Sequence, residues 1–295
     1  MSDTEHADPR MAGLEGWPAA AVLSALWEGQ LAAVAAVGPA LPALGAAAAA
    51  ALPRLQAGGR LAYAGAGTSG RIAAQDGAEL RPTFGFDRTV LLLAGGPDAL
   101  LRAAEGAEDR ADQGLTDAAG LGGQDVLIAV AASGRTPYTL ACTRAARAQG
   151  ALTIGIAHSA GSPLLCGAEY PVLLATGAEP IAGSTRMKAG TAQKVALNLL
   201  STLLMLGLGR VYRGRMVDMV VSNEKLRARA VTMVQELAGV GSAPATQALA
   251  DAEGHVKLAV MLASGWTRPA AEAVLGVHRG RLGDALQETP RPVRR

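Results

Sequence analysis

The sequence predicts an α/β protein with a parallel sheet, a helical N-terminal arm and a small helical C-terminal region. From Gly59 onward, short apolar segments alternate with helical patterns, which is typical of βαβ units. One segment, Val126–Ala132, is apolar throughout, as expected for a strand buried on both faces of a parallel sheet. The first apolar segment runs into a glycine-rich turn, Gly65–Gly70, and such a turn before a helix is a common anion-binding arrangement.

Five segments have the length and composition of strands: Leu61–Ala64, Thr89–Leu93, Asp125–Ala131, Leu152–Ile156 and Tyr170–Leu174. Between them, helices are expected over Arg71–Glu79, Asp98–Gln113 and Pro137–Gln149. Ligands of such sheets bind beyond the carboxyl ends of the strands. We therefore expect a site formed by the loops at residues 65–70, 94–97, 132–137 and 157–163.

Helical patterns flank the strand region on both sides in the sequence. Two helices are expected before it, around Pro18–Gln30 and Leu41–Gln56. After it come a long apolar helix that ends near Leu206, a helix over about Met216–Leu237, and three or four short helices between Ser242 and Leu286. The chain is therefore predicted to form an N-terminal arm, an α/β domain and a C-terminal helical region, at residues 1–58, 59–238 and 239–295.

The composition excludes several classes of partner. Half of the 295 residues are apolar and 18% are charged, as in a globular protein. A net charge of +2 provides no general attraction to nucleic acid or membranes, and 3% aromatic residues are too few for base-stacking platforms. The two cysteines and four histidines show no metal-ligand spacing. We therefore expect a small-molecule ligand and no metal.

One uncharged stretch, Leu31–Pro53, is long enough to cross a membrane. It is mostly alanine and is interrupted by Pro39 and Pro42, whereas spanning helices are usually rich in larger apolar residues. The polar N-terminus has no signal-peptide pattern. A cytoplasmic protein is therefore expected.

The first glycine-rich turn is predicted to bind a phosphate group. Backbone N–H groups near Gly67 and the hydroxyls of Thr68 and Ser69 are suitable donors. The turn also matches the G-x-G-x-x-G pattern of dinucleotide-binding proteins. However, the second strand runs into Ala94-Gly95-Gly96 and lacks the acidic residue that would hold a ribose. A phosphorylated small molecule is therefore favoured over a dinucleotide.

A second hydroxyl-rich turn follows the third strand. Ser133, Gly134, Arg135 and Thr136 precede Pro137, which suits the first turn of a helix. An ordinary N-cap by Thr136 would explain part of this pattern. Because both turns are expected at the same edge of the sheet, we favour a second group of phosphate ligands.

Basic and hydroxyl side chains also gather before the long apolar helix: Ser184, Thr185, Arg186 and Lys188. Cations at a helix N-terminus oppose the helix dipole. A bound anion or a subunit interface would account for them, and a solvated basic turn is the alternative.

Carboxylates are the candidates for acid–base chemistry. Glu79 lies at the end of the helix predicted after the first glycine-rich turn. Glu105, Glu108 and Asp109 lie in the next predicted helix, where Glu105 and Glu108 would share a face. Most such residues are solvated surface charges, so spacing alone leaves both interpretations open.

Six motifs, in the order AGAGTSGR, AELRPTFG, AEGAED, AASGRTPY, GSTRMKAGTAQK and MVDMVVSNEKLRARAV, closely resemble those of the N-acetylmuramic acid 6-phosphate etherase family. The resemblance covers nearly the whole chain. It implies a sugar isomerase (SIS) domain, a flavodoxin-like three-layer αβα sandwich with a five-stranded parallel sheet, followed by a helical tail. The glucokinase regulatory protein shares this ancestry.

The resemblance further implies a cofactor-free, homodimeric, cytoplasmic enzyme of cell-wall sugar recycling. Such an enzyme cleaves the D-lactyl ether of N-acetylmuramic acid 6-phosphate. The family's catalytic glutamates fall on Glu79, expected to be the acid, and Glu108, expected to be the base. The sugar phosphate would contact Thr68, Ser69, Ser133 and Thr136, and the remaining binding residues are predicted to be Gly67, Gly134, Arg135, Ser184, Thr185, Arg186 and Lys188.

The chain departs from the family pattern at Leu80 and Arg81, where Cys-Pro is common, and at Asp8, where Asn is usual. Arg81 would lower the pKa of Glu79 if the two residues paired, which disfavours an acid. Two other functions on the same fold are an aldose–ketose sugar-phosphate isomerase and a non-catalytic sugar-phosphate-binding regulator. The isomerase needs no acid aimed at the C3 oxygen.

Overall fold

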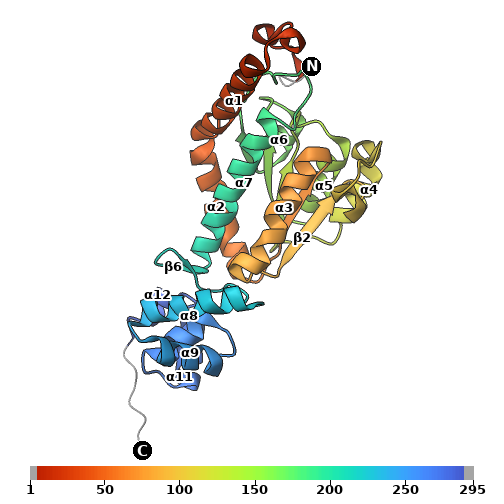
Figure 1. The fold of residues 1–295 in the computed structure, drawn as a ribbon. Coiled ribbons are helices and arrows are strands. Elements are labelled where there is room, and N and C mark those ends of the chain that lie inside the picture. The colour runs from red at the N-terminus through yellow and green to blue at the C-terminus, as the bar shows by residue number, and fades with distance from the viewer. Residues whose placement is uncertain (1–4, 289–295) are drawn as a thin grey trace, which may run out of the picture. The chain divides into compact units, whose positions relative to one another are not determined.

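The computed structural model describes residues 5–288, and the chain divides into two compact units (Figure 1). The first unit contains the N-terminal residues to Ala78 and Arg88–Thr202. The second unit contains Glu79–Asp87 and the chain from Leu203 onward. Helix α8 (Glu224–Ala238), which the sequence division includes in the α/β domain, packs on α9 (Ser242–Asp251) and α10 (Val256–Ala263) and lies in the second unit.

The first unit is built on a five-stranded parallel sheet. Its strands are β1 (Leu61–Gly65), β2 (Thr89–Leu93), β3 (Val126–Val130), β4 (Leu152–Ala157) and β5 (Tyr170–Leu173), in the spatial order β2-β1-β3-β4-β5. Every residue of β1, β3 and β4 is buried, as predicted from their apolar composition. The flavodoxin-like strand order and the strand assignments are therefore confirmed.

Helices surround this sheet: α1 (Ala19–Ala35), α2 (Leu41–Gln56), α3 (Gly67–Phe84), α4 (Ala111–Ala118), α5 (Pro137–Ala148), α6 (Pro163–Gly167) and α7 (Lys188–Gly207). Buried residues of α4, α5 and α6 pack with Ala62 and Ala64 of β1 on one face of the sheet. On the other face, the Tyr63 hydroxyl donates to Asp76 of α3 at 2.7 Å. Asn198 and Ser201 of α7 donate to the same carboxylate. The result is a three-layer αβα sandwich.

The prediction of one helix over Asp98–Gln113 is wrong. The segment instead contains two short 3₁₀ turns, Pro97–Leu100 and Ala107–Asp109, joined by irregular chain. Gly106 adopts a left-handed conformation, with φ of 70°, which ends any regular helix. Glu105 and Glu108 therefore do not share a helix face.

The apolar region Ala19–Gln56 satisfies the length and composition of a membrane span. It consists of α1 and α2, with 17 and 16 residues, separated by the 3₁₀ turn Gly38–Ala40. Each helix is shorter than the roughly 20 residues that cross a bilayer. Helix α2 also buries one face, which carries Leu44, Ala47, Ala48, Ala51 and Leu55.

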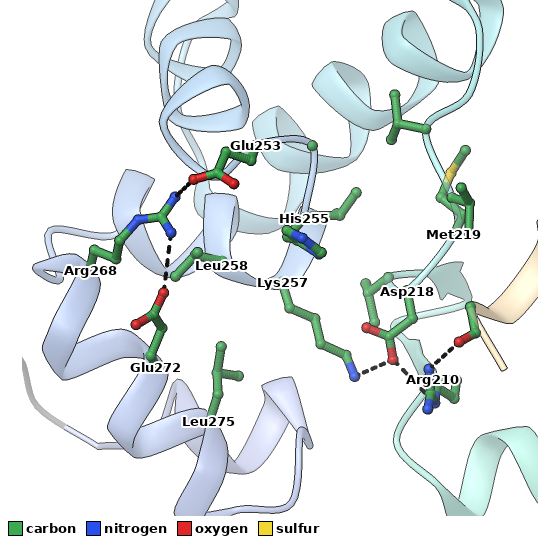
Figure 2. Close-up of a pocket in the computed structure, with 16 residues that line it drawn as sticks. Arg210, Asp218, Met219, Glu253, His255, Lys257, Leu258, Arg268, Glu272 and Leu275 are labelled. Carbon is green, nitrogen blue, oxygen red and sulfur yellow. Dashed lines mark hydrogen bonds and ion pairs between the residues drawn. The ribbon is translucent and has the colours of Figure 1, made fainter. Parts of the chain in front are cut away.

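The second unit is a helical cluster with one small hairpin. It contains β6 (Val211–Tyr212), β7 (Arg215–Met216), α8, α9 (Ser242–Asp251), α10 (Val256–Ala263), α11 (Arg268–Val277) and α12 (Leu282–Ala285). The four short helices after residue 242 agree with the prediction. The helix expected from Met216 begins only at Glu224, because Asn223 caps it by accepting from the Leu226 N–H at 2.9 Å. Ion pairs join the hairpin region to α10, as between Asp218 and Lys257 (Figure 2).

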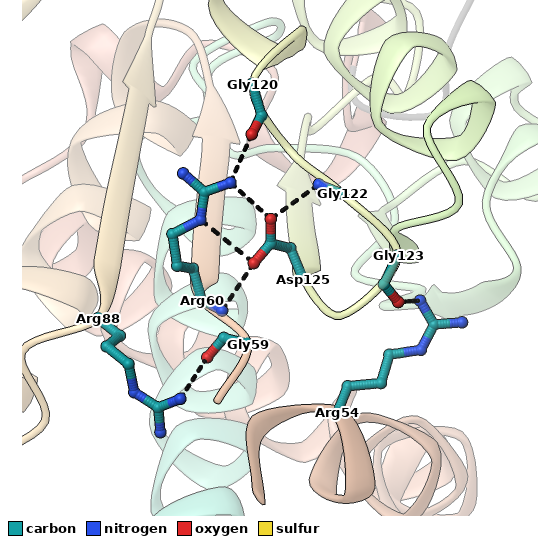
Figure 3. A network of polar contacts seen from close by, with 8 residues as sticks. All are labelled: Arg54, Gly59, Arg60, Arg88, Gly120, Gly122, Gly123 and Asp125. Atoms are coloured by element: carbon teal, nitrogen blue, oxygen red, sulfur yellow. Dashed lines mark hydrogen bonds and ion pairs between the residues drawn. The ribbon is translucent and has the colours of Figure 1, made fainter. Parts of the chain in front are cut away.

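Arginines join the amino ends of the strands in the first unit (Figure 3). The carboxylate of Asp125 accepts from the Arg60 guanidinium at 2.6 Å and from the Gly122 N–H at 2.8 Å. Arg54 donates to the carbonyls of Gly123 and Gly150. Burial alone would raise the pKa of Asp125, but the hydrogen bonds from Arg60 and Gly122 outweigh burial and lower it.

Candidate active site

The first glycine-rich turn lies at the carboxyl end of β1 and opens α3. Gly67 begins this helix with a positive φ of 52°. A Cβ at Gly70 would lie 2.4 Å from Leu93 Cδ1 and 2.7 Å from the backbone of Gly65. Only glycine allows this close approach, and the first backbone N–H groups of α3 have no partner within the helix. The turn therefore presents neutral hydrogen-bond donors, with Thr68 and Ser69 beside them.

The second turn connects β3 to α5. Thr136 occupies the N-cap position of α5, but its side chain makes no capping hydrogen bond. Ser133 Oγ accepts from the Arg135 N–H at 3.2 Å. Gly134 has a φ of 66°, and a Cβ there would lie 2.2 Å from Ser162 Oγ. The N-cap explanation therefore does not account for the Thr136 hydroxyl, which stays available to a ligand.

Both turns line one pocket of about 480 Å³ at the carboxyl edge of the sheet, called here the sheet-edge pocket. Its lining residues are Glu5, Ala66, Gly67, Thr68, Ser69, Glu108, Asp109, Ala132, Ser133, Arg135, Thr136, Pro137, Gly183 and Thr185. Two of the four loops expected to contribute, residues 94–97 and 157–163, supply none of these described residues. The pocket thus combines hydroxyls and backbone donors with one cation, Arg135, and three carboxylates.

Glu108 is exposed at the wall of this pocket, on the 3₁₀ turn Ala107–Asp109. Within residues 5–288, no cation lies at ion-pair distance from Glu108. A carboxylate at the wall of a pocket lined by hydroxyls and backbone N–H groups can exchange a proton with a bound small molecule. Glu5 and Asp109 line the same pocket. Asp109 was among the candidate carboxylates of the sequence analysis, whereas Glu5 was not singled out.

Glu79 is exposed on α3 and does not line the sheet-edge pocket. It belongs to the second compact unit, whereas the two hydroxyl-rich turns belong to the first. Its catalytic role stays a prediction.

The basic segment before α7 divides into lining and structural residues. Gly183 and Thr185 line the pocket, whereas Ser184 and Arg186 do not. Lys188 is buried, and its ammonium donates to the Ala178 carbonyl at 2.8 Å.

A buried carboxylate explains how cations are tolerated at the start of α7. Glu179 is fully buried and accepts from the backbone N–H groups of Lys188 and Ala189, both at 2.9 Å. The sequence analysis missed this capping role, because a cap nine residues before the helix has no recognised spacing. The role of Lys188 as a substrate ligand stays a prediction.

Family models identify the class of protein. Residues 44–147 match the glucokinase regulatory protein N-terminal SIS domain, and residues 111–203 match the SIS domain. A phosphoheptose isomerase from Francisella tularensis has a similar fold, with a TM-score of 0.50 and 19% sequence identity, over 64% of this chain and 100% of that chain. The fold is therefore that of a SIS-domain protein.

Curated relatives narrow the class to one family. An N-acetylmuramic acid 6-phosphate etherase from Deinococcus radiodurans is 50% identical, with 88% of this chain and 86% of the relative covered. Another from Streptomyces avermitilis is 43% identical, with 98% and 94% covered. The chain belongs to the N-acetylmuramic acid 6-phosphate etherase family.

Proposed function

We propose that this protein cleaves the D-lactyl ether of N-acetylmuramic acid 6-phosphate, giving N-acetylglucosamine 6-phosphate and D-lactate, as a step of amino-sugar recycling. Family membership supports the reaction. The observation that carries the proposal is the position of Glu108 beside two hydroxyl-rich turns in the sheet-edge pocket. Such an enzyme is a carbon–oxygen lyase.

The phosphate would bind where the two turns meet. Backbone N–H groups of the α3 N-terminus and the hydroxyls of Thr68, Ser69, Ser133 and Thr136 supply donors. Arg135 supplies a positive charge at the same pocket. Ser184, Arg186 and Lys188 do not line it, so Gly183 and Thr185 are the more direct contacts of their segment.

The chemistry is an elimination followed by an addition. In the open-chain sugar, the C1 aldehyde acidifies the C2 proton, and Glu108 takes that proton. The bond between C3 and the lactyl oxygen breaks, and Glu79 gives a proton to the departing oxygen. Water then adds across the resulting double bond, with its hydroxyl group at C3 and a proton at C2. Each glutamate thus serves as an acid or base in turn.

A homodimer is proposed from the apolar surface of α1. Leu23, Trp27, Leu31 and Val34 follow one another at helical spacing and are 68%, 62%, 50% and 47% exposed. Such a row of large apolar side chains marks a protein contact surface, and a second copy of the chain is the partner proposed. Trp27→Glu is expected to give monomers in light scattering, and dimers of this variant would contradict the assignment.

Glu79 would then act in the pocket of the second subunit, because it does not line the pocket of its own chain. Glu79→Gln and Glu108→Gln subunits can be mixed to test this. In-trans action predicts about a quarter of native activity in an equal mixture, because half of the dimers are mixed and each has one complete site of two. No recovery on mixing would place both glutamates in the site of one chain.

One experiment separates ether cleavage from isomerisation. The purified protein is incubated with N-acetylmuramic acid 6-phosphate in heavy-oxygen water, and D-lactate and the sugar are analysed by mass spectrometry. Elimination and addition predict lactate release with label in the sugar. Label in the lactate alone would exclude this mechanism, and a ketose product without lactate would indicate an isomerase. The protein is proposed to be cytoplasmic, where sugar phosphates are metabolised.

A further inference from the structure

The second compact unit contains a cavity of about 640 Å³ that shares no lining residue with the sheet-edge pocket, called here the C-terminal cavity (Figure 2). Its walls are the segment 217–221, the start of α10 and one side of α11, and all of its lining residues belong to the second unit. Small-molecule sites typically measure about 300–1,000 Å³. The cavity is therefore large enough for a small ligand.

One side of the cavity carries an excess of positive charge. Lys257 Nζ lies 2.5 Å from Asp218 Oδ2, and Arg210 Nε lies 3.5 Å from the same oxygen. Two cations thus share one carboxylate, which leaves one positive charge. The Lys257 side chain is only 11% exposed, and burial lowers its pKa although Asp218 acts in the opposite direction. A second carboxylate, brought by a ligand, would compensate this charge.

The opposite side of the cavity carries an excess of negative charge. The Arg268 guanidinium lies 3.0 Å from Glu253 Oε1 and 3.3 Å from Glu272 Oε1. Two carboxylates thus share one cation, which leaves one negative charge. Figure 2 shows these three residues across the cavity from Asp218 and Lys257. A ligand ammonium group would find its counter-charge at this side.

Apolar side chains lie between the two charged sides. Leu258 and Leu275 extend from α10 and α11, and Met219 and Val221 come from the segment 217–221. Apolar side chains between two opposite charges suit a ligand that has an apolar body and both charges. A simple anion would be repelled by the Glu253 side, and a simple cation by the Lys257 side.

We propose that the C-terminal cavity binds a small zwitterion with an apolar side chain, a free amino acid or dipeptide. Its carboxylate would contact Lys257 and Arg210, and its ammonium group would contact Glu253 and Glu272. The proposal does not depend on ether cleavage, because the sheet-edge pocket shares no lining residue with this cavity.

Isothermal titration of the native protein tests the proposal with leucine and alanyl-leucine as ligands. Leucinamide lacks the carboxylate, and N-acetylleucine lacks the ammonium group. Loss of the carboxylate is expected to weaken binding about 30-fold, because it removes the partner of a mostly buried ammonium. Loss of the ligand ammonium is expected to weaken binding about threefold, because Glu253 and Glu272 are half exposed or more.

Two variants test the contacts separately. Lys257→Met should bind leucine about as weakly as the native protein binds leucinamide, and Glu272→Gln should lose only the preference for leucine over N-acetylleucine. Lys225→Met and Glu236→Gln, at an exposed lysine and an ion-paired glutamate outside the cavity, are the matched controls. Absence of leucine and alanyl-leucine binding at millimolar concentration, or equal binding of all four ligands, would overturn the proposal. If Lys257→Met does not fold, leucinamide tests the same contact.

Discussion

The two compact units use carboxylates in opposite ways. In the sheet-edge pocket, Glu108 and Asp109 have no ion-pair partner among residues 5–288, and the rest of the lining provides hydroxyls, backbone N–H groups and one cation, Arg135. In the C-terminal cavity, the carboxylate of Asp218 contacts Lys257 and Arg210, and those of Glu253 and Glu272 contact Arg268.

The difference in ion pairing suggests different roles for the carboxylates of the two units. A buried carboxylate that contacts cations is costly to remove, because its partners would lose their counter-charge. A carboxylate that lines a pocket without such contacts is accessible to a bound molecule. We therefore propose proton transfer for the first unit, and stability and binding of charged ligands for the second.

The largest effect is expected from Glu108→Gln. An amide cannot take the C2 proton, so D-lactate release should fall at least about a hundredfold, with little change in the free energy of unfolding because the side chain is exposed. Glu105→Gln, three residues earlier and outside the pocket, should retain native turnover. Equal losses in the two variants would contradict the assignment of proton transfer to the carboxylate that lines the pocket.

Asp218→Asn should act on stability. It leaves Lys257 and Arg210, both mostly buried, without their counter-ion, and we expect a loss of about 3 kcal/mol in the free energy of unfolding. Urea unfolding monitored by circular dichroism measures it. Asp112→Asn, which breaks the exposed ion pair with Arg110, should change stability little. A small effect at Asp218 would contradict the structural role of the paired carboxylates.

Gly70→Ala tests whether the neutral donors depend on backbone packing. The added Cβ would overlap Leu93 and the backbone of Gly65, which should cost about 2 kcal/mol of stability and raise the KM for the sugar phosphate. Gly45 of α2 has open space around it, so Gly45→Ala should stabilise the protein by about 0.5–1 kcal/mol. A change of the same sign in the free energy of unfolding of both variants would contradict this packing argument.

The smallest effect concerns pH and Asp125. Its folded-state pKa is lowered, because hydrogen bonds from Arg60 and Gly122 outweigh burial. The contribution of Asp125 to the free energy of unfolding is therefore complete above the unfolded pKa of about 3.9. It decreases as the pH falls through the lower pKa of the folded state. Asp125→Asn should lose about 1 kcal/mol at pH 7, since Arg60 is 42% exposed and the pair is screened. The difference from native protein should shrink near pH 3 in urea titrations.

Local patterns predicted most elements correctly. The five strands and both hydroxyl-rich turns lie where the sequence placed them, because apolar runs and glycine requirements depend on neighbouring residues. The helix expected over Asp98–Gln113 failed at Gly106, whose left-handed conformation is not visible in helical periodicity. The helix expected over about Met216–Leu237 is present as α8, but its start was placed too early, because Arg215 and Met216 pair with β6.

The sequence by itself determined the strands of the core, the two hydroxyl-rich turns and the family. Only the tertiary structure decided which charged residues share a pocket. It placed Glu108 at the sheet-edge pocket, turned Lys188 inward to the Ala178 carbonyl, and joined Lys257 to Asp218, 39 residues away. The physical reason is range: strand and turn preferences act between near neighbours, whereas a counter-ion or a shared pocket depends on how distant segments pack.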